Sequence, residues 1–323
     1  DGGWWQMFVA LVKKYGLVPK EAYPESSNSR DSSAFEQYLN TKLREFAAEL
    51  RDAHQAGKSV EELRSLKTGQ MSVVYRICAI AMGEPPASFD LLLRVKDDAK
   101  ASESCTKSGI DSRRQIVEHG ITPQEFYAKY VGKDLDDFVS LTNSPLASTP
   151  YYRRYQLAFV GNVAEAAPMD FINVPLDVFR KAAVDQLTAG HPIWFACDCT
   201  QFALRKDGFF DQSVVRVDQL FGTEFTGDKA HGLEYGDSPS NHAMTFTGVN
   251  LGEDGKPNRW KVENSWGKDN GEDGYYVASD AWFDRYVTEI IIRREYLDDA
   301  TLALLESEPV ELDPWQPLTK RCR

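Results

Sequence analysis

The spacing of apolar residues changes near Pro150, and this change limits the folds open to the chain more than any other feature. Before Pro150, apolar residues recur every three or four positions, as in amphipathic helices; Phe35, Leu39 and Leu43 form one such series. After it, the apolar runs are short, rich in β-branched and aromatic residues, and separated by Gly, Asp and Asn. The pattern predicts an α+β protein, with its helices grouped before Pro150 and an antiparallel sheet or barrel after it.

Helix start signals occur at several points in the first half of the chain. Ser33 with Glu36, and Ser59 with Glu62, have the spacing of capping boxes, and Thr122-Pro123 opens another helical stretch. A short apolar helix is also expected near the start of the chain, ending before a glycine. The expected helices cover residues 4–15, the stretch that begins at residue 33, residues 59–83 and residues 122–131.

Five strand-like runs follow in the second half, at residues 192–197, 243–249, 260–264, 275–277 and 288–293. Residues 252–255 (Gly-Glu-Asp-Gly) form the expected hairpin turn between two of them. One short helix should precede Gly190, and a last helix should begin at Asp298. The tail beyond that helix is rich in proline, which favours an extended arm over a packed element.

Composition and charge narrow the partners that the chain can have. Its 323 residues are 42% hydrophobic and carry a formal net charge of -12, so a polyanion such as DNA or RNA would be repelled on average. No apolar run approaches the roughly 20 residues that a membrane helix needs. Neither a nucleic acid nor a membrane is therefore expected as a partner.

The chain has five cysteines, and their odd, sparse arrangement does not resemble a disulfide framework. The spacing Cys197-x-Cys199 is wrong for a zinc knuckle, and no neighbouring His or Cys pair would complete four ligands. No metal ion or other cofactor is therefore expected. Reduced structural thiols are typical of cytoplasmic proteins, and a cytoplasmic location is the corresponding prediction.

One of the five histidines stands in a context that suggests chemistry. His242 opens a strand-like run, Asn264 ends the next, and Trp266 follows closely. If the two strands are antiparallel neighbours, the imidazole and the amide would lie side by side. A base that activates a thiol must keep one tautomer, which an Asn carbonyl accepting from the far ring N–H would fix. Trp266 would shield that hydrogen bond from water.

The alternative is that His242 is a core histidine and Asn264 part of an ordinary turn. Either motif alone favours this structural interpretation, but the two motifs together, in this order, favour the catalytic one. The remaining histidines are expected to be structural or solvated: His54, His119, His191 and His231.

Motifs from one end of the chain to the other support the catalytic interpretation. They are DGGW (1–4), KYGLVPK (14–20), YPES (23–26), WFACD (194–198), HAMTFTGV (242–249), VENSWG (262–267), GY (274–275), AWF (281–283) and PWQP (314–317). Together they resemble the bleomycin hydrolase / aminopeptidase C family of papain-superfamily cysteine peptidases. The resemblance implies a papain-like fold with a helical lobe and an antiparallel β-barrel lobe, to which a helical module and a C-terminal arm are added.

The resemblance also implies a division of the chain and a set of catalytic roles. Residues 1–32 would be the remainder of the helical lobe, 33–150 the helical module, 151–297 the β-rich lobe, and 298–323 the last helix and arm. His242 would act as general base and acid towards a cysteine thiolate, and Asn264 would orient it. Trp266 would cover their hydrogen bond and line the leaving-group side.

Substrate contacts are implied for Gly2, Gly3, Asn241, Ala243, Trp266 and Arg323. The two glycines would let an extended peptide approach the backbone closely. In the family that the chain resembles, the C-terminal arm enters the cleft, and its terminal carboxylate, here that of Arg323, pairs with the free amine of the substrate. Such an arm makes the enzyme an aminopeptidase, because it excludes a chain that continues beyond the amine. The family is described as hexameric, so peptide substrates and copies of the same chain are the expected partners.

Two features depart from the family pattern. The nucleophile of the family lies in a Gln…Cys-Trp motif upstream of the Asp-Gly-Gly stretch, and none of the five cysteines has that context. The expectation is that the complete protein is the enzyme and that this chain alone is inactive. The tail is also more cationic than the resemblance implies, since Lys320 and Arg321 precede Arg323, and cations there would oppose the attraction of an amine.

Two alternatives stay open at this stage. A non-catalytic oligomeric scaffold, or an inactive fragment of the family, would explain why no cysteine fits the nucleophile motif. A papain-like endopeptidase would use the same His242 and Asn264, although the long helical module and proline-rich arm argue against it.

Overall fold

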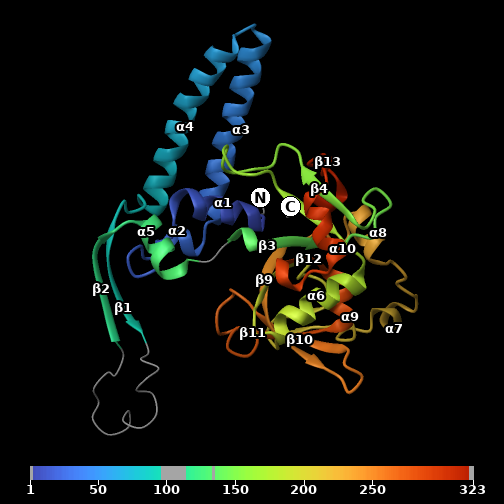
Figure 1. The fold of residues 1–323 in the computed structure, drawn as a ribbon. Coiled ribbons are helices and arrows are strands. Elements are labelled where there is room, and N and C mark those ends of the chain that lie inside the picture. Colours follow the sequence, from blue (N-terminus) through green and yellow to red (C-terminus); the bar gives the residue numbers. More distant parts are fainter. Residues whose placement is uncertain (1–2, 96–113, 133–134, 320–323) are drawn as a thin grey trace. The chain divides into compact units, whose positions relative to one another are not determined.

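The computed structural model describes residues 3–95, 114–132 and 135–319, and the chain forms two compact units (Figure 1). The first unit comprises residues 1–14 and 133–323, and the second comprises residues 15–132. The sequence predicts boundaries after residues 32, 150 and 297, whereas the contacts divide the chain after Lys14 and Gly132. The four-part division therefore stays a prediction, and each unit is described below by itself.

A large, mostly antiparallel sheet forms the framework of the first unit. Its strands are β3 (Phe138–Thr142), β4 (Arg153–Leu157), β5 (Asp170–Asn173), β6 (Ile193–Cys197), β7 (Ala203–Leu204), β8 (Phe209–Phe210), β9 (His242–Leu251), β10 (Pro257–Glu263), β11 (Tyr275–Ser279), β12 (Val287–Arg293) and β13 (Val310–Leu312). Their order across the sheet is β13-β4-β5-β3-β12-β6-β9-β10-β11-β8-β7. All five predicted strands are present, and the predicted turn at residues 252–255 joins β9 to β10.

Several helices complete the first unit. They are α1 (Trp5–Tyr15), α6 (Leu176–Thr188), α7 (Val217–Phe221), α8 (Lys229–Glu234), α9 (Asp280–Tyr286) and α10 (Asp299–Ala303), with short 3-10 turns at Leu135–Asp137, Arg294–Tyr296, Leu304–Glu306 and Pro317–Thr319. The helices predicted at residues 4–15, before Gly190 and from Asp298 are confirmed. Helix α6 packs on β9 and β12, and α9 packs on β10, β11 and β12.

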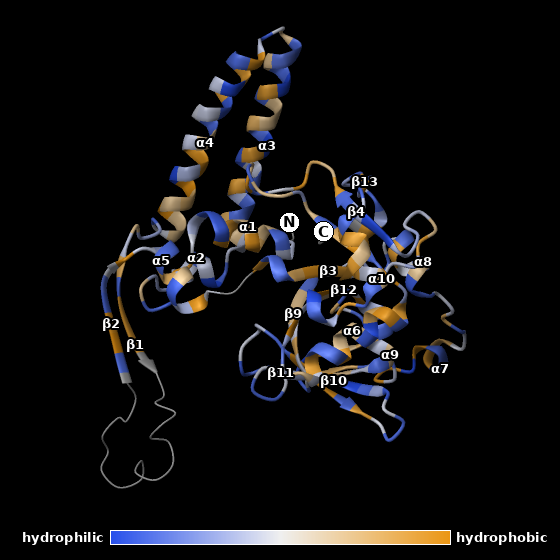
Figure 2. Ribbon diagram, in the orientation of Figure 1, coloured by the Kyte–Doolittle hydropathy of each residue, from blue (hydrophilic) through white to orange (hydrophobic). Residues whose placement is uncertain are grey.

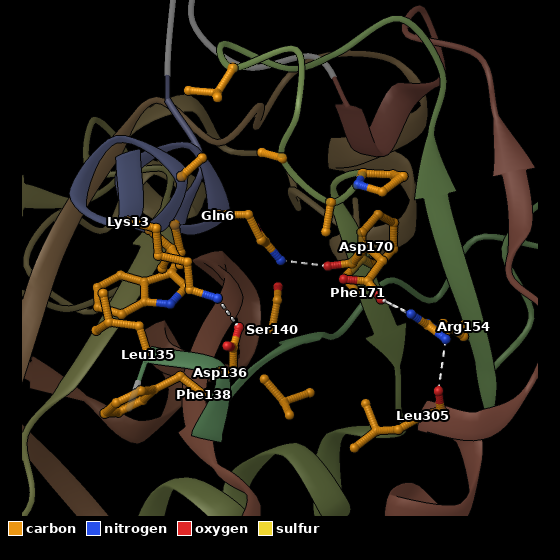
Figure 3. Close-up of a pocket in the computed structure, with 18 of the residues that line it drawn as sticks. Gln6, Lys13, Leu135, Asp136, Phe138, Ser140, Arg154, Asp170, Phe171 and Leu305 are labelled. Atoms are coloured by element: carbon orange, nitrogen blue, oxygen red, sulfur yellow. Dashed lines mark hydrogen bonds and ion pairs between the residues drawn. The ribbon is translucent and has the colours of Figure 1, made fainter. Parts of the chain in front are cut away.

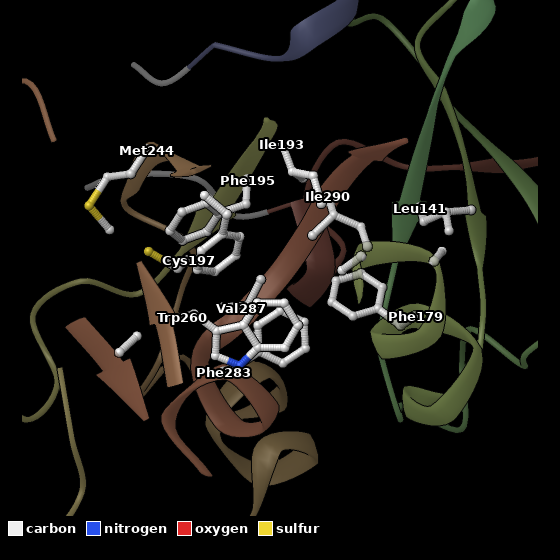
Figure 4. Packing of buried hydrophobic residues seen from close by; sticks show 14 of the residues in the cluster. Leu141, Phe179, Ile193, Phe195, Cys197, Met244, Trp260, Phe283, Val287 and Ile290 are labelled. Carbon is white, nitrogen blue, oxygen red and sulfur yellow. The ribbon is translucent and has the colours of Figure 1, made fainter. Parts of the chain in front are cut away.

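The main core lies where α6 and α9 meet the sheet (Figure 4). Phe195 on β6 stacks on Phe246 on β9, and Trp260 on β10 stacks on Phe283 on α9 with their ring centroids 4.2 Å apart. All four of these aromatic side chains are fully buried. Burial of such side chains is the main favourable contribution to folding, and here it fixes the relative positions of β6, β9 and β10, the strands that lead to the candidate site.

The proline-rich tail is more ordered than the sequence predicts. Val310–Leu312 forms β13, which pairs in parallel with β4, and Leu312 is buried. The prolines flank this strand at Pro309 and Pro314, so its own backbone N–H groups stay free to join the ladder. The expectation of an unpacked arm is therefore wrong for this part of the tail.

The second unit is built on a long helical hairpin. It contains α2 (Ser27–Arg30), α3 (Ser33–Gln55), α4 (Val60–Met82), β1 (Phe89–Val95), β2 (Arg114–Ile121), α5 (Pro123–Phe126) and a π-helical turn at Tyr127–Val131. Helix α3 has no buried residue, and Gln70 is the only buried residue of α4 among those described. Figure 2 shows hydrophobic and hydrophilic residues interspersed along both helices. Several of the exposed residues are large and apolar, among them Tyr38, Tyr75 and Ile80.

The capping signals of the second unit are partly confirmed. Ser59 and Glu62 form the predicted capping box at the start of α4, and Thr122 forms another with Glu125. The box predicted for Ser33 does not form, because helix α3 begins at Ser33 itself. The hydroxyl of Ser32 donates a hydrogen bond to the Glu36 carboxylate instead.

Strands β1, β2 and β3 correct the expectation that residues 33–150 are helical. Strands β1 and β2 pair as an antiparallel hairpin outside the main sheet, and β3 belongs to the first unit. A short apolar run such as residues 91–93 has no period that distinguishes a strand from a buried helix. Whether it forms a strand depends on the segment with which it pairs. Of the described helices, none is both long enough and apolar enough to cross a bilayer.

Candidate active site

The structure brings His242 and Asn264 together at one end of neighbouring strands. His242 is the first residue of β9, and Asn264 directly follows the last residue of β10. Because β9 and β10 are antiparallel neighbours, the start of one strand lies beside the end of the other. His242 Nε2 is 2.9 Å from Asn264 Oδ1. The proximity predicted from the two motifs is therefore confirmed, and the catalytic roles of the two residues stay a prediction.

The hydrogen bonds around Asn264 fix the tautomer of His242. Asn264 Oδ1 also accepts from the backbone N–H of Ser265 at 2.8 Å, which identifies this atom as the amide oxygen. An oxygen can only accept, so His242 Nε2 carries the proton that it donates. In the neutral imidazole the lone pair is then on Nδ1. The atom of His242 that can take a proton from a thiol, or return one to a leaving amine, is therefore Nδ1.

Trp266 lies against the imidazole, and its predicted role in covering the His242–Asn264 hydrogen bond stays a prediction. Its ring centroid is 4.9 Å from that of His242, and the two planes are inclined by 24°. The guanidinium carbon of Arg205 lies 4.7 Å from the centre of the Trp266 ring, and Tyr276 meets the indole edge-on. The indole thus limits the motion of the imidazole and removes water from one of its faces.

The loop after Asn264 is shaped by close backbone contacts. The Asn264 N–H donates to the carbonyl of Gly274, and the Asn270 side chain donates to the carbonyl of Trp266. Gly271 has a φ of +61°, and a Cβ atom there would lie 2.3 Å from the carbonyl oxygen of Tyr275. Only glycine fits such a position. These contacts hold Asn264 and Trp266 where they meet His242.

Asn241 is held by the loop that follows β6. Its side-chain oxygen accepts from the Cys199 N–H at 3.0 Å, and its Nδ2 donates to Asp198 Oδ1 at 2.5 Å. Asp198 is 1% exposed, and the same oxygen also accepts from the backbone and hydroxyl of Thr200. The amide of Asn241 therefore anchors the start of β9, one residue before His242. Its predicted contact with substrate stays a prediction.

The amide of Asn264 has a second buried neighbour in Tyr276. Burial raises the pKa of the Tyr276 phenol, an effect that the neighbouring Asn264 side chain partly offsets. In the part of the chain that the structure describes, Asn264 Nδ2 and the Tyr276 hydroxyl oxygen are buried without a hydrogen-bond partner at normal distance. Tyr276 is buried beside the site, whereas Ser265 is exposed.

Cys197 is the strand residue opposite His242 in the register of β6 and β9, but it does not have the properties of a nucleophile. Its side chain is fully buried, and this burial raises the pKa of the thiol well above the usual range. A thiol that stays protonated is a poor nucleophile. Cys199 is also buried, so neither of the described cysteines of the first unit has the exposure of a nucleophile.

The other predicted site residues are placed as follows. Ala243 is half-buried and pairs with Ala196 of β6, on the sheet face opposite the core residues Phe195 and Met244. Gly3 is exposed, and Gly2 and Arg323 lie outside the described residues. Over residues 3–95, 114–132 and 135–319, no cluster of three or more His, Cys, Asp or Glu side chains has the arrangement of a metal site.

Sequence reasoning did not find Arg205 or Asp198. Arg205 follows the short strand β7 at the far edge of the sheet, and no local pattern links it to Trp266. Asp198 could have been singled out from the sequence, because an acidic residue between two cysteines at the end of an apolar strand must either be solvated or have a hydrogen-bond partner.

Comparisons with known proteins identify the family that the chain matches. The Peptidase C1-like family matches residues 1–319. Aminopeptidase C of Streptococcus thermophilus is 41% identical over 318 residues, which cover 98% of this chain and 68% of that protein. Aminopeptidase W of Lactobacillus delbrueckii subsp. lactis is 38% identical, with the same coverage of both chains.

One solved structure is similar over nearly the whole chain. The crystal structure of PepW from Lactobacillus rhamnosis HN001 has a TM-score of 0.90 and 39% sequence identity. The similarity covers 99% of this chain and 69% of that one.

Proposed function

This chain belongs to the Peptidase C1-like family of cysteine peptidases, and we propose that it supplies the base and the orienting amide of a cysteine aminopeptidase. His242 is the base and Asn264 is the amide. The observation that carries the proposal is the 2.9 Å contact between His242 Nε2 and Asn264 Oδ1, under the Trp266 ring. Relatives named aminopeptidase C and aminopeptidase W support the exopeptidase assignment.

His242 performs the proton transfers of the proposed reaction. Nδ1 accepts the proton of a cysteine thiol, and the resulting thiolate attacks the carbonyl carbon of the first peptide bond. Nδ1 then returns the proton to the leaving amine, which leaves an acyl group on sulfur as a thioester. Water, deprotonated by Nδ1, hydrolyses the thioester and restores the thiol. Asn264 keeps the imidazole in one tautomer and one orientation through each step.

The proposal assigns the nucleophile to a cysteine in the context of the family's Gln…Cys-Trp motif. Cys197 is unsuitable because its thiol is buried and has a raised pKa. The motif also contains the glutamine that helps to stabilise the oxyanion in the family that the chain resembles.

The proposed exopeptidase specificity depends on the end of the chain. The carboxylate of Arg323 would pair with the free amine of the substrate, while Gly2, Gly3 and Ala243 would line the path of the peptide. Removing the last residues should then weaken the preference for substrates with a free amino group. Coumarin amides of single amino acids, compared with their acetylated forms, measure this preference.

The catalytic role of His242 is tested with His242→Ala in the complete polypeptide that contains this chain. General acid–base catalysis typically contributes about 10²- to 10⁴-fold, so kcat for an aminoacyl coumarin amide should fall by at least about a hundredfold. His231→Ala is the matched control, because His231 is an exposed residue of α8 that bonds to Asp228. Undiminished turnover in His242→Ala would contradict the catalytic role of His242, and a complete polypeptide without any turnover would favour the non-catalytic scaffold.

We also propose that the complete protein is a cytoplasmic hexamer that acts on peptides. Support comes from the α3–α4 hairpin, where Tyr38 is 75% exposed and Ile80 is 80% exposed. Such side chains on long helices favour contacts with other copies of the chain. Light scattering after size-exclusion chromatography measures the oligomer, and Ile80→Lys should reduce its mass if this surface is used. Free thiols at Cys78, Cys197 and Cys199 support a reducing location.

A further inference from the structure

Two pairs of residues in the first unit bury side-chain polar atoms that have no hydrogen-bond partner at normal distance within the described residues. Trp5 and Gln6 form one pair, beside a cavity of about 750 Å³ between α1 and the sheet (Figure 3). None of the residues that line this cavity belongs to the candidate active site. Asn264 and Tyr276 form the other pair, and Asn264 contacts His242 directly. The second pair therefore bears on the proposed chemistry.

Strand register places the Tyr276 side chain next to the Asn264 amide. Val262 of β10 pairs with Tyr276 of β11, and both side chains belong to the buried core. Asn264 lies two residues beyond Val262, which puts its side chain on the same face of the sheet. Its N–H still bonds to the Gly274 carbonyl, so the ladder between the two segments continues as far as Asn264. Diagonal neighbours of this kind are within reach of each other when one of them is aromatic.

The two ends of the Asn264 amide are distinguished by their contacts. Oδ1 accepts from the His242 ring and from the Ser265 N–H. The end that is left for Tyr276 is Nδ2, which can only donate, so the phenol oxygen is the acceptor. A donor against that oxygen stabilises the phenolate, and the neighbouring Asn264 side chain does lower the pKa of the Tyr276 phenol, against the larger effect of burial, which raises it.

Tyr276 is itself held in place by the core. Its side chain is 1% exposed, and its ring stacks on Phe210 of β8 with the centroids 5.1 Å apart. The Trp266 indole meets the same ring at 85°. A ring that is packed on two sides cannot follow a neighbouring amide that turns. The phenol oxygen is therefore a fixed point behind the site.

An amide that is held at both ends has one orientation. With the phenol oxygen in place, Asn264 points Nδ2 into the core and Oδ1 at the imidazole. Without that oxygen, Nδ2 would be a buried donor that has lost its acceptor, which is costly enough to favour rotation of the amide towards another acceptor. Rotation would move Oδ1 off the line of the His242 Nε2–H bond and weaken the control of the tautomer.

We propose that Tyr276 is a positioning residue for the base: its phenol oxygen accepts from Asn264 Nδ2 and fixes the angle at which Asn264 meets His242. The inference rests on the proposed function, because it concerns the same imidazole. Tyr276 acts on the reaction only through Asn264, and it is too deeply buried to touch the substrate.

The first test is Tyr276→Phe in the complete polypeptide that contains this chain. Loss of the hydrogen bond should lower kcat for an aminoacyl coumarin amide by about three- to tenfold. KM should change by less than about twofold, because the lost contact is not made to the substrate. Tyr275→Phe is the matched control, since Tyr275 is the preceding residue of β11, points to the opposite face and packs against Lys261. Its kcat should stay unchanged, and an equal kcat for the two variants would overturn the inference.

A double-mutant cycle then separates positioning from a merely structural role. Asn264→Ala should lower kcat by more than Tyr276→Phe does, because it removes the acceptor of the His242 ring itself. In the Asn264→Ala background, Tyr276→Phe should cause no further loss of kcat, since nothing remains for the phenol to position. The same fold-loss in both backgrounds would show that Tyr276 acts independently of Asn264 and would overturn the inference.

Urea unfolding of the same variants tests the contact without turnover. Tyr276→Phe should lower the unfolding midpoint, and should lower it less when Asn264→Ala is also present, because the donor that loses its acceptor is then absent. Additive shifts would overturn the contact, and coupled shifts with additive losses of kcat would overturn the positioning role. If His242→Ala keeps full turnover, the proposed function fails, while the unfolding cycle still decides whether Tyr276 holds Asn264.

Discussion

The two units of the molecule differ in where their apolar side chains lie. In the first unit, Trp260, Trp282 and Phe283 are fully buried around the sheet. In the second, α3 buries no residue, and the compact cluster around Phe89 and Ile121 is small. The first unit therefore has an internal core that supports the strands carrying His242 and leading to Asn264. The second unit depends on capped helices and on whatever its exposed apolar surface contacts.

The largest expected effect tests this difference directly. Phe283→Ala should lower the free energy of unfolding of the first unit by about 3–5 kcal/mol, because it empties a site against Trp260 and Phe246. Urea unfolding followed by tryptophan fluorescence reports on this unit alone, since all seven tryptophans lie in it. Tyr38→Ala on α3 is the comparison, and unfolding of the helices followed by circular dichroism should shift by less than about 0.5 kcal/mol. Similar shifts for the two variants would contradict the contrast between the units.

The second prediction compares one cysteine from each unit. Cys78 on α4 is half-buried, whereas Cys197 is fully buried and its thiol has a raised pKa. Alkylation requires the thiolate and access to it, so Cys197 can react only when the core opens. Iodoacetamide should label Cys78 about a hundredfold faster or more, as measured by peptide mass spectrometry. Comparable rates would mean that the core of the first unit opens as readily as the helical hairpin.

The third prediction concerns the edge of the core, where the site is built. Asn241→Ala should lower the free energy of unfolding by about 1–3 kcal/mol, because buried Asp198 and the Cys199 N–H each lose a hydrogen-bond partner. Asn250→Ala is the matched control on the same strand, since its side chain is exposed and bonds only to Asn258 in the described residues. Urea unfolding measures both variants. Equal effects would show that the loop after β6 does not anchor the start of β9.

The smallest expected effect is that of Arg205→Ala. Its guanidinium lies over the Trp266 ring, and a cation–π contact at an exposed position contributes about 0.5–1 kcal/mol. Arg259→Ala, an exposed arginine on β10, should cost less in the same urea experiment. If Arg205→Ala has no effect while Asn241→Ala does, the site is held from β6 and not from the Trp266 side.

The helices and strands of both units were largely predictable, because the periodicity of apolar residues that indicates them is visible in short stretches of sequence. The capping box at Ser59, the hairpin turn at 252–255 and the strands that carry His242 and Asn264 all follow such local rules. The hairpin β1–β2 and the tail strand β13 could not be predicted in this way, because each forms only by pairing with residues elsewhere in the chain. Their short apolar runs are compatible with more than one structure until that pairing is known.

The sequence by itself determined the fold class, the family motifs and the expectation that His242 and Asn264 meet. Only the tertiary structure decided which atoms meet: Oδ1 of Asn264 faces Nε2 of His242, and this leaves Nδ1 as the basic nitrogen. It alone placed Arg205 on Trp266, tied Asn241 to Asp198, and left a cavity beside Trp5 and Gln6. The physical reason is that periodicity and capping act over a few residues. Contacts between distant residues depend instead on strand register and close packing, which the whole chain sets together.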